Sequence, residues 1–82
     1  MIWTSSKAAL IELIYALQSS GAINGGAAEL KEIASVTEKV FNIDLKDYYR
    51  TFIEIRSRKI QSTKFIDKLK DSLISRMEES DA

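Results

Sequence analysis

Apolar residues recur every three or four positions in four stretches of this chain, each bounded by residues that start or stop helices. The first stretch predicts a helix over about residues 5–19, with the hydroxyl run 4–6 as N-cap candidates and Gly21 as the left-handed residue after its end. Apolar side chains cover most of its circumference, which is typical of a central helix packed on more than one side. Glu12 falls on the remaining polar side.

A second helix is predicted over residues 28–41, followed by Asn42 as a left-handed terminator. The glycine-rich segment 22–27 separates the two helices, and Asn24 with Gly25 favours a tight turn there because both residues tolerate positive φ. This segment lacks the preceding strand and the glycine and lysine spacing of a phosphate-binding loop. We therefore interpret it as a connection and not as a nucleotide site.

The third helix is predicted over residues 45–58. Asp44 is the expected N-cap, and Asp47 is the acidic partner three residues later. At about 100° per residue, one face is apolar and the other polar. The apolar face holds Leu45, Tyr48, Tyr49, Phe52, Ile53 and Ile55, and the polar face holds Lys46, Asp47, Arg50, Thr51, Glu54, Ser57 and Arg58. We interpret both tyrosines as core residues, although tyrosines can also stack on bases.

A basic stretch, residues 56–64, leads to a fourth helix predicted over residues 64–78, with Ser62 or Thr63 as its cap. The acidic tail 78–82 lacks apolar anchors and is expected to fray. The sequence thus predicts a single all-α domain, residues 1–82, with four helices. The short turn predicted at 42–44 between the second and third helices matches a helix-turn-helix, but any helical bundle also has short turns.

Charge is unevenly distributed although the net charge is zero. Residues 1–45 carry three basic and five acidic side chains, residues 46–70 eight and three, and residues 71–82 one and four, giving net charges of −2, +5 and −3. A basic centre suits a polyanionic partner, because local potential steers association. Lysine and arginine also solvate ordinary helix surfaces, so charge alone leaves both readings open.

Several classes of function are disfavoured by composition. The chain has no cysteine and no histidine, so it offers no disulfide framework and no expected zinc site, and we expect neither metal, cofactor nor enzymatic activity. No apolar run approaches the roughly 20 residues that span a bilayer, and no signal peptide is visible. We expect a soluble cytoplasmic protein that contacts no membrane and binds no small-molecule ligand in this domain.

Three runs of the chain resemble the C-terminal part of RteC-family regulators of Bacteroides mobile elements. They are KAALIELIYALQSSGAIN, LKEIASVTEKVFNIDLKDYYRTFIEIRSRK and STKFIDKLKDSLISRMEESD, and together they cover nearly the whole chain. The resemblance implies a DNA-binding domain of helix-turn-helix or winged-helix type. The few residues between Lys59 and Thr63 leave room for at most a rudimentary wing. It also implies the C-terminal part of a longer transcriptional regulator that activates excision genes of a tetracycline-inducible conjugative transposon.

The leading hypothesis from the sequence is therefore that the helix 45–58 enters the major groove of double-stranded DNA. Base contacts are assigned to Lys46, Arg50, Thr51 and Glu54, and phosphate contacts to Ser57, Arg58, Lys59, Thr63 and Lys64. The alternative is a helical protein-interaction or dimerisation module with no direct DNA contact. Its partners would be an acidic protein that meets the basic centre, a second copy of the chain, or the missing N-terminal domain, which would dock on the wide apolar surface of the first helix.

Overall fold

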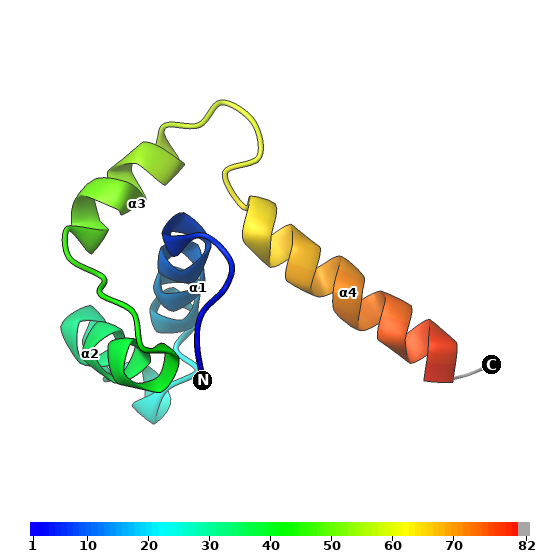
Figure 1. Cartoon of the computed structure of the whole chain (residues 1–82), viewed down its shortest axis with the longest axis horizontal. Helices are drawn as coiled ribbons and strands as arrows, with labels where there is room; N and C mark the ends of the chain where they lie inside the picture. The colour runs from blue at the N-terminus through cyan, green and yellow to red at the C-terminus, as the bar shows by residue number, and fades with distance from the viewer. Residues whose placement is uncertain (81–82) are drawn as a thin grey trace.

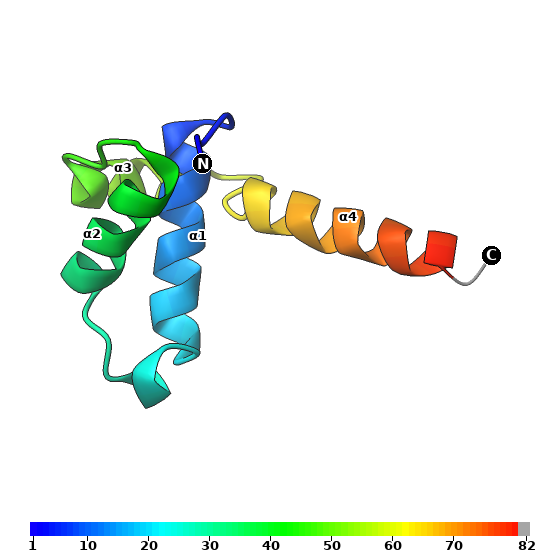
Figure 2. The same ribbon diagram turned by 60° about the horizontal axis from the view of Figure 1, so that its bottom comes forward.

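The computed structural model describes residues 1–80 and confirms an all-α fold of four helices over that range. The helices are α1 (Lys7–Ser20), α2 (Leu30–Phe41), α3 (Tyr48–Arg56) and α4 (Lys64–Ser80), with a 3-10 turn η1 (Asn24–Gly26) between α1 and α2. No strand occurs in residues 1–80. α2 and α3 lie beside α1, and α4 projects away from this group (Figures 1 and 2). None of these helices is long and apolar enough to cross a bilayer.

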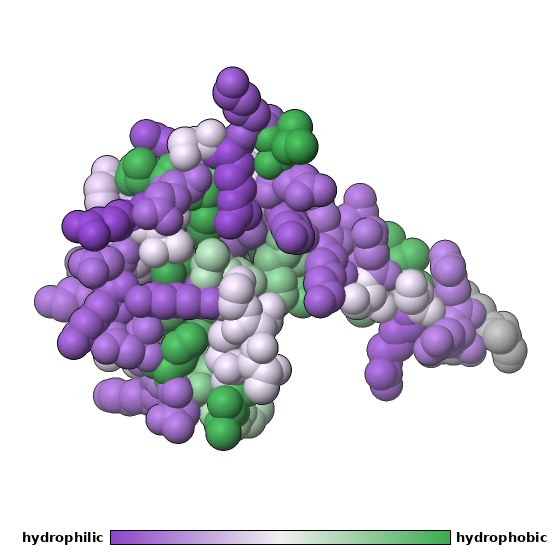
Figure 3. All heavy atoms as spheres, turned by 45° about the horizontal axis from the view of Figure 1, so that its top comes forward, coloured by the Kyte–Doolittle hydropathy of each residue, from purple (hydrophilic) through white to green (hydrophobic). Residues whose placement is uncertain are grey.

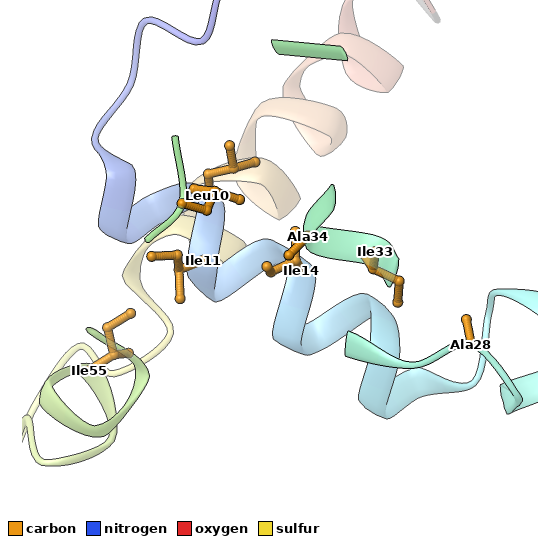
Figure 4. Close-up of a cluster of buried hydrophobic side chains, with 8 residues drawn as sticks. Leu10, Ile11, Ile14, Ala28, Ile33, Ala34 and Ile55 are labelled. Carbon is orange, nitrogen blue, oxygen red and sulfur yellow. The ribbon is translucent and has the colours of Figure 1, made fainter. Parts of the chain in front are cut away.

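α1 is the centre of the fold, as its wide apolar surface predicts. Every close backbone approach between two helices in residues 1–80 involves α1. Leu10, Ile11 and Ile14 of this helix are fully buried, and Figure 4 shows them between side chains of α2 and α3. The core cluster consists of Leu10, Ile11, Ile14, Ala28, Ile33, Ala34, Leu45 and Ile55.

The residues predicted to cap α1 and to terminate α1 and α2 do so in the structure. Ser6 is the N-cap of α1, with its hydroxyl oxygen accepting a hydrogen bond from the Ala9 N–H at 3.0 Å. Gly21 and Asn42 take the left-handed conformation after α1 and α2, with φ of 73° and 52°. The helices are slightly shorter at their N-termini than predicted, since α1 begins at Lys7 and α2 at Leu30.

The predicted start of the third helix is wrong. α3 begins at Tyr48, and Asp44 is not its cap, because the Asp44 carboxylate accepts from the Lys46 N–H at 2.9 Å within the preceding loop. The Leu45 N–H donates to the Glu38 carboxylate of α2 at 2.8 Å, and the Leu45 side chain is buried. These two hydrogen bonds hold the loop 42–47 in a non-helical path. The loop is therefore longer than the predicted turn.

Trp3 joins the N-terminal segment to both α2 and α4. Its backbone N–H donates to the Phe41 carbonyl at 3.1 Å, and its indole N–H donates to the Ser6 carbonyl at 2.7 Å. The indole meets the ring of Phe41 edge-on at a centroid distance of 5.1 Å and the ring of Phe65 at 5.6 Å. Such pairs contribute about 0.5–1.5 kcal/mol beyond their buried area.

Glu12 attaches α4 to α1 from the polar side of α1. The residue is only 7% exposed, and its carboxylate accepts a hydrogen bond from the Ile66 N–H in the first turn of α4 at 2.7 Å. The free N–H groups of a helix start carry partial positive charge, so a carboxylate there is favourable. The Thr63 hydroxyl lies 3.3 Å from both oxygens of the Asp67 carboxylate.

α4 extends beyond its predicted end. It continues to Ser80, so the tail expected to fray from Glu78 is helical up to that residue. The last two positions of that predicted tail lie outside the described residues. The part of α4 from Asp67 to Glu79 is exposed throughout.

We predict that Glu12→Ala lowers the free energy of unfolding by about 1–3 kcal/mol, because it leaves the Ile66 N–H without its acceptor. Glu12→Gln retains a carbonyl oxygen as acceptor and should lose less. Equilibrium denaturation measures both changes, and Glu54→Ala, at an exposed position of α3, is the control. Equal stability of Glu12→Ala and the unaltered protein would contradict this role.

Candidate nucleic-acid interface

α3 presents a polar face to solvent while its other face packs on α1. Arg50 and Glu54, both predicted to contact bases, are exposed on α3, and Thr51 is half-buried. Tyr49 is 65% exposed, so its assignment to the core is wrong. Tyr48 is half-buried, as predicted. The exposed face therefore carries one aromatic ring in addition to the predicted polar side chains.

An aromatic stack sets the orientation of α3 on α1. The ring of Tyr15 in α1 lies parallel to that of Phe52 in α3, with centroids 3.9 Å apart and an interplanar angle of 5°. Tyr48 meets Tyr15 edge-on at 6.4 Å, and Ile55 is buried in the core one turn further along α3. Because Phe52 and Ile55 point toward α1, Arg50 and Glu54 point away from it.

Lys46 lies in the loop before α3 and not on the helix. Its side chain is 84% exposed, and its ammonium group lies 3.7 Å from the Asp44 carboxylate. The carbonyl of Lys46 accepts a hydrogen bond from the Lys7 ammonium group at 2.8 Å. The backbone hydrogen bond from Lys46 lowers the pKa of Asp44, and the charges of Lys46 and Lys7 add to this effect. Lys46 is thus held near the first residue of α1.

The five residues assigned to phosphates occupy the loop after α3 and the first residue of α4, and all are exposed. The Ser57 hydroxyl donates to the Glu54 carbonyl at 2.8 Å, and the Thr63 hydroxyl bonds to Asp67. Both hydroxyl protons are therefore engaged within the chain. Arg58, Lys59 and Lys64 carry the positive charge of this segment.

Arg58 and Lys64 converge on a hollow at the N-terminal end of α1. The hollow has a volume of about 280 Å³ and is also lined by Lys68, Glu12 and Phe65, together with Ser5 and Ser6. The N-terminus of α1 adds the partial positive charge of its free N–H groups. Lys46, Arg50 and Lys59 do not line it.

Three cations, Arg58, Lys64 and Lys68, thus line one hollow at the N-terminal end of α1, and we call them the basic cluster. Lys7 and Lys46 are joined nearby by the hydrogen bond from the Lys7 ammonium group to the Lys46 carbonyl. Lys7 adjoins Ser6 of the hollow and holds the loop that carries Lys46. Lys7 and Lys68 are not among the residues that the sequence pattern predicts for the site. No sequence pattern around these two lysines indicates a site. They come close to the predicted residues only because α3 and α4 pack on α1.

Two acidic side chains in the described part of the chain lie among these cations, since Glu12 lines the hollow and the Asp44 carboxylate lies 3.7 Å from the Lys46 ammonium group. No three acidic side chains in residues 1–80 lie close enough together to hold a metal ion. Glu12 is buried against the start of α4, and Asp67 bonds to Thr63. These contacts give both carboxylates structural partners.

A comparison with protein-family models matches residues 1–81 to the family described as RteC protein. Searches of curated proteins and of solved structures found no match.

We predict that Tyr15→Phe does not lower stability and raises it by up to about 1 kcal/mol, because the buried Tyr15 hydroxyl has no hydrogen-bond partner in residues 1–80. Burial first, and then the neighbouring charges of Tyr48 and Tyr49, raise the pKa of Tyr15. Its neutral form is favoured in the folded state. The contribution of neutral Tyr15 to the free energy of unfolding is therefore fully present below a pH of about 10. It is lost as the pH rises through the folded-state pKa.

Denaturation between neutral and alkaline pH tests this prediction. Tyr15→Phe should lose less stability at alkaline pH than the unaltered protein. Tyr49→Phe removes only one of the neighbouring charges that raise the pKa of Tyr15, so it should recover a smaller part of that loss. A Tyr15→Phe variant that is clearly less stable at neutral pH would show that the hydroxyl makes a stabilising hydrogen bond.

Proposed function

Because this chain belongs to the RteC family, we propose that it is the sequence-specific DNA-binding domain of a bacterial transcriptional regulator. The observation that supports this proposal best is the basic cluster at the N-terminal end of α1, next to the exposed polar face of α3. The hollow is lined by three cations and one carboxylate, and such a local excess of positive side chains favours a polyanion over a neutral partner. As the family resemblance implies, the full regulator would activate excision genes of a mobile element in the bacterial cytoplasm.

In this proposal α2, the loop 42–47 and α3 act as a helix-turn-helix in which both helices pack on α1 and not closely on each other. α3 lies in the major groove, with Arg50 reading guanine and Thr51 and Glu54 contacting neighbouring base edges. The exposed ring of Tyr49 contacts the sugar or the thymine methyl group beside them. Lys46 precedes the helix, so it approaches the flanking base edge or its phosphate.

The backbone of the duplex is held by the basic cluster. Arg58 and Lys64 contact one phosphate over the hollow, with Lys68 beside them, at the positive end of the α1 dipole. Lys59 contacts the adjacent phosphate. Ser57 and Thr63 join these contacts by rotating their hydroxyl groups away from Glu54 and Asp67.

A second candidate, a helical interaction module, is favoured by the uncovered apolar side chains on α4. The two candidates differ at low salt, where a DNA-binding domain associates with any duplex and an interaction module does not.

We predict that the affinity for a random-sequence duplex falls steeply with salt, and that Lys64→Ala reduces the log–log slope by about 0.9. Arg58→Ala should act similarly because it lines the same hollow. Fluorescence anisotropy over a range of salt concentrations measures the slope. Lys31→Ala, at an exposed lysine of α2, removes the same charge away from the cluster and is the matched control. A slope unchanged by both cluster variants would reject the phosphate assignment.

We predict that Arg50→Ala reduces discrimination between a preferred duplex and a random one by about 1–3 kcal/mol, because a bidentate guanine contact is lost. The preferred duplex is first selected from a random pool with the unaltered protein. The log–log slope of affinity against salt concentration should change little in this variant, because Arg50 is assigned to a base and not to a phosphate. This result would distinguish a base contact from a phosphate contact. Equal discrimination by the variant and the unaltered protein would place the base contacts elsewhere.

A further inference from the structure

Glu12 is the only acidic side chain among the described residues that line the hollow of the basic cluster. Arg58, Lys64 and Lys68 line the same hollow. No ion pair joins Glu12 to any of these three cations in residues 1–80. Figure 3 shows hydrophilic side chains gathered where α4 meets the rest of the molecule. A carboxylate therefore lies inside the site to which we assign a phosphate group.

The Glu12 carboxylate also holds the part of α4 that supplies two of the cations. It accepts a hydrogen bond from the Ile66 N–H at 2.7 Å, and Ile66 lies midway between Lys64 and Lys68 in the sequence. The N–H groups of Lys64 and Asp67 have acceptors in the loop directly before α4. Ile66 instead takes its acceptor from another helix. This hydrogen bond therefore helps to fix where the first turns of α4 lie against α1.

The position of α4 decides whether the three cations can face one anion. Lys64 and Lys68 are four residues apart, so they lie on the same side of the helix, and both line the hollow. Arg58 belongs to the loop after α3 and not to α4. A rotation of α4 away from Glu12 would move the two lysines together away from Arg58. The hydrogen bond to Ile66 is thus a condition for the basic cluster.

The charge of Glu12 acts against the same anion. The residue is only 7% exposed, so water screens its carboxylate weakly. Repulsion between this carboxylate and a phosphate group in the hollow is therefore stronger than it would be at an exposed position. A neutral acceptor at position 12 would keep the hydrogen bond and remove the repulsion.

We propose that Glu12 is a positioning residue of the phosphate site and that its charge limits the affinity of this site. Its hydrogen bond assembles the basic cluster, and its negative charge offsets part of the positive charge there. A weakened phosphate contact leaves the choice of DNA site to the base contacts of α3, because phosphate contacts carry no sequence information. This role rests on the proposed function, in which the phosphate group belongs to DNA.

Two substitutions of Glu12 separate the effects of the hydrogen bond and of the charge. Glu12→Gln keeps a carbonyl oxygen as acceptor and removes the charge, whereas Glu12→Met keeps the length of the side chain and removes both. We expect Glu12→Gln to bind inorganic tripolyphosphate several-fold more tightly than the unaltered protein. Glu12→Met should bind it several-fold more weakly than Glu12→Gln. Isothermal titration calorimetry at low salt measures the affinities, and circular dichroism verifies that the variants remain helical.

A purely structural role of Glu12 would give a different order of affinities. Glu12→Gln would then bind no more tightly than the unaltered protein, and this result would overturn the proposal. Equal affinities of folded Glu12→Gln and Glu12→Met would overturn the positioning role. Glu32→Gln removes the same charge from an exposed position on α2 and is the matched control. An equal gain in affinity from Glu32→Gln would show that only the net charge matters.

The location of the anion is tested with Lys68→Ala. This variant should bind tripolyphosphate several-fold more weakly than the unaltered protein, because Lys68 lines the hollow. An unchanged affinity would place the anion elsewhere and overturn the proposal.

Amide hydrogen exchange tests the positioning role in the unaltered protein. If the basic cluster forms only when the Ile66 N–H is bonded to Glu12, tripolyphosphate should slow the exchange of this amide several-fold. The Leu45 N–H also donates to a carboxylate, that of Glu38, and is the matched control. Exchange at Ile66 that tripolyphosphate does not slow would overturn the positioning role.

A random-sequence duplex distinguishes failure of this role from failure of the proposed function. If tripolyphosphate gives the expected order of affinities and the duplex does not bind at low salt, the role of Glu12 stands and the DNA-binding function fails. If the duplex binds and Glu12→Gln binds neither the duplex nor tripolyphosphate more tightly, the DNA-binding function stands and the role of Glu12 fails.

Discussion

The whole fold depends on one constraint, which is that a single helix must provide the packing surface for three others. Leu10, Ile11 and Ile14 of α1 are fully buried, and in residues 1–80 every close approach between two helices involves α1. A chain of 82 residues can bury only about 60% of its unfolded surface. Sharing one apolar helix makes economical use of that limited core, because α1 then serves as the packing partner of all three other helices.

The elements governed by local chemistry could be predicted from the sequence. The central role of α1 follows from its wide apolar arc, and the ends at Gly21 and Asn42 follow from their tolerance of positive φ. The start of α3 could not be predicted in the same way. Its position depends on the Glu38 carboxylate reaching the Leu45 N–H from another helix. A pattern of residue types along the chain carries no information about that contact.

Glu12 shows the same limitation for the candidate site. A helical projection places Glu12 opposite the apolar arc, which is equally consistent with solvent exposure and with capping a distant helix. The capped residue, Ile66, is 54 positions away. Arg58 and Lys64 were predicted as individual phosphate ligands, but their convergence with Lys68 depends on this attachment. The types of side chain at the site were therefore predictable, whereas their grouping was not.

The contacts of Trp3 make the joint between α4 and the rest of the molecule directly observable by optical spectroscopy. Trp3 is the only tryptophan of the chain, and its indole touches Phe65 at the start of α4. The emission of an indole depends on the polarity around it, so intrinsic fluorescence reports on this one position without an added label. Any movement of α4 away from α1 would expose the Trp3 ring to water and shift its emission to longer wavelength. The fluorescence of Trp3 therefore reports whether α4 is docked on the rest of the molecule.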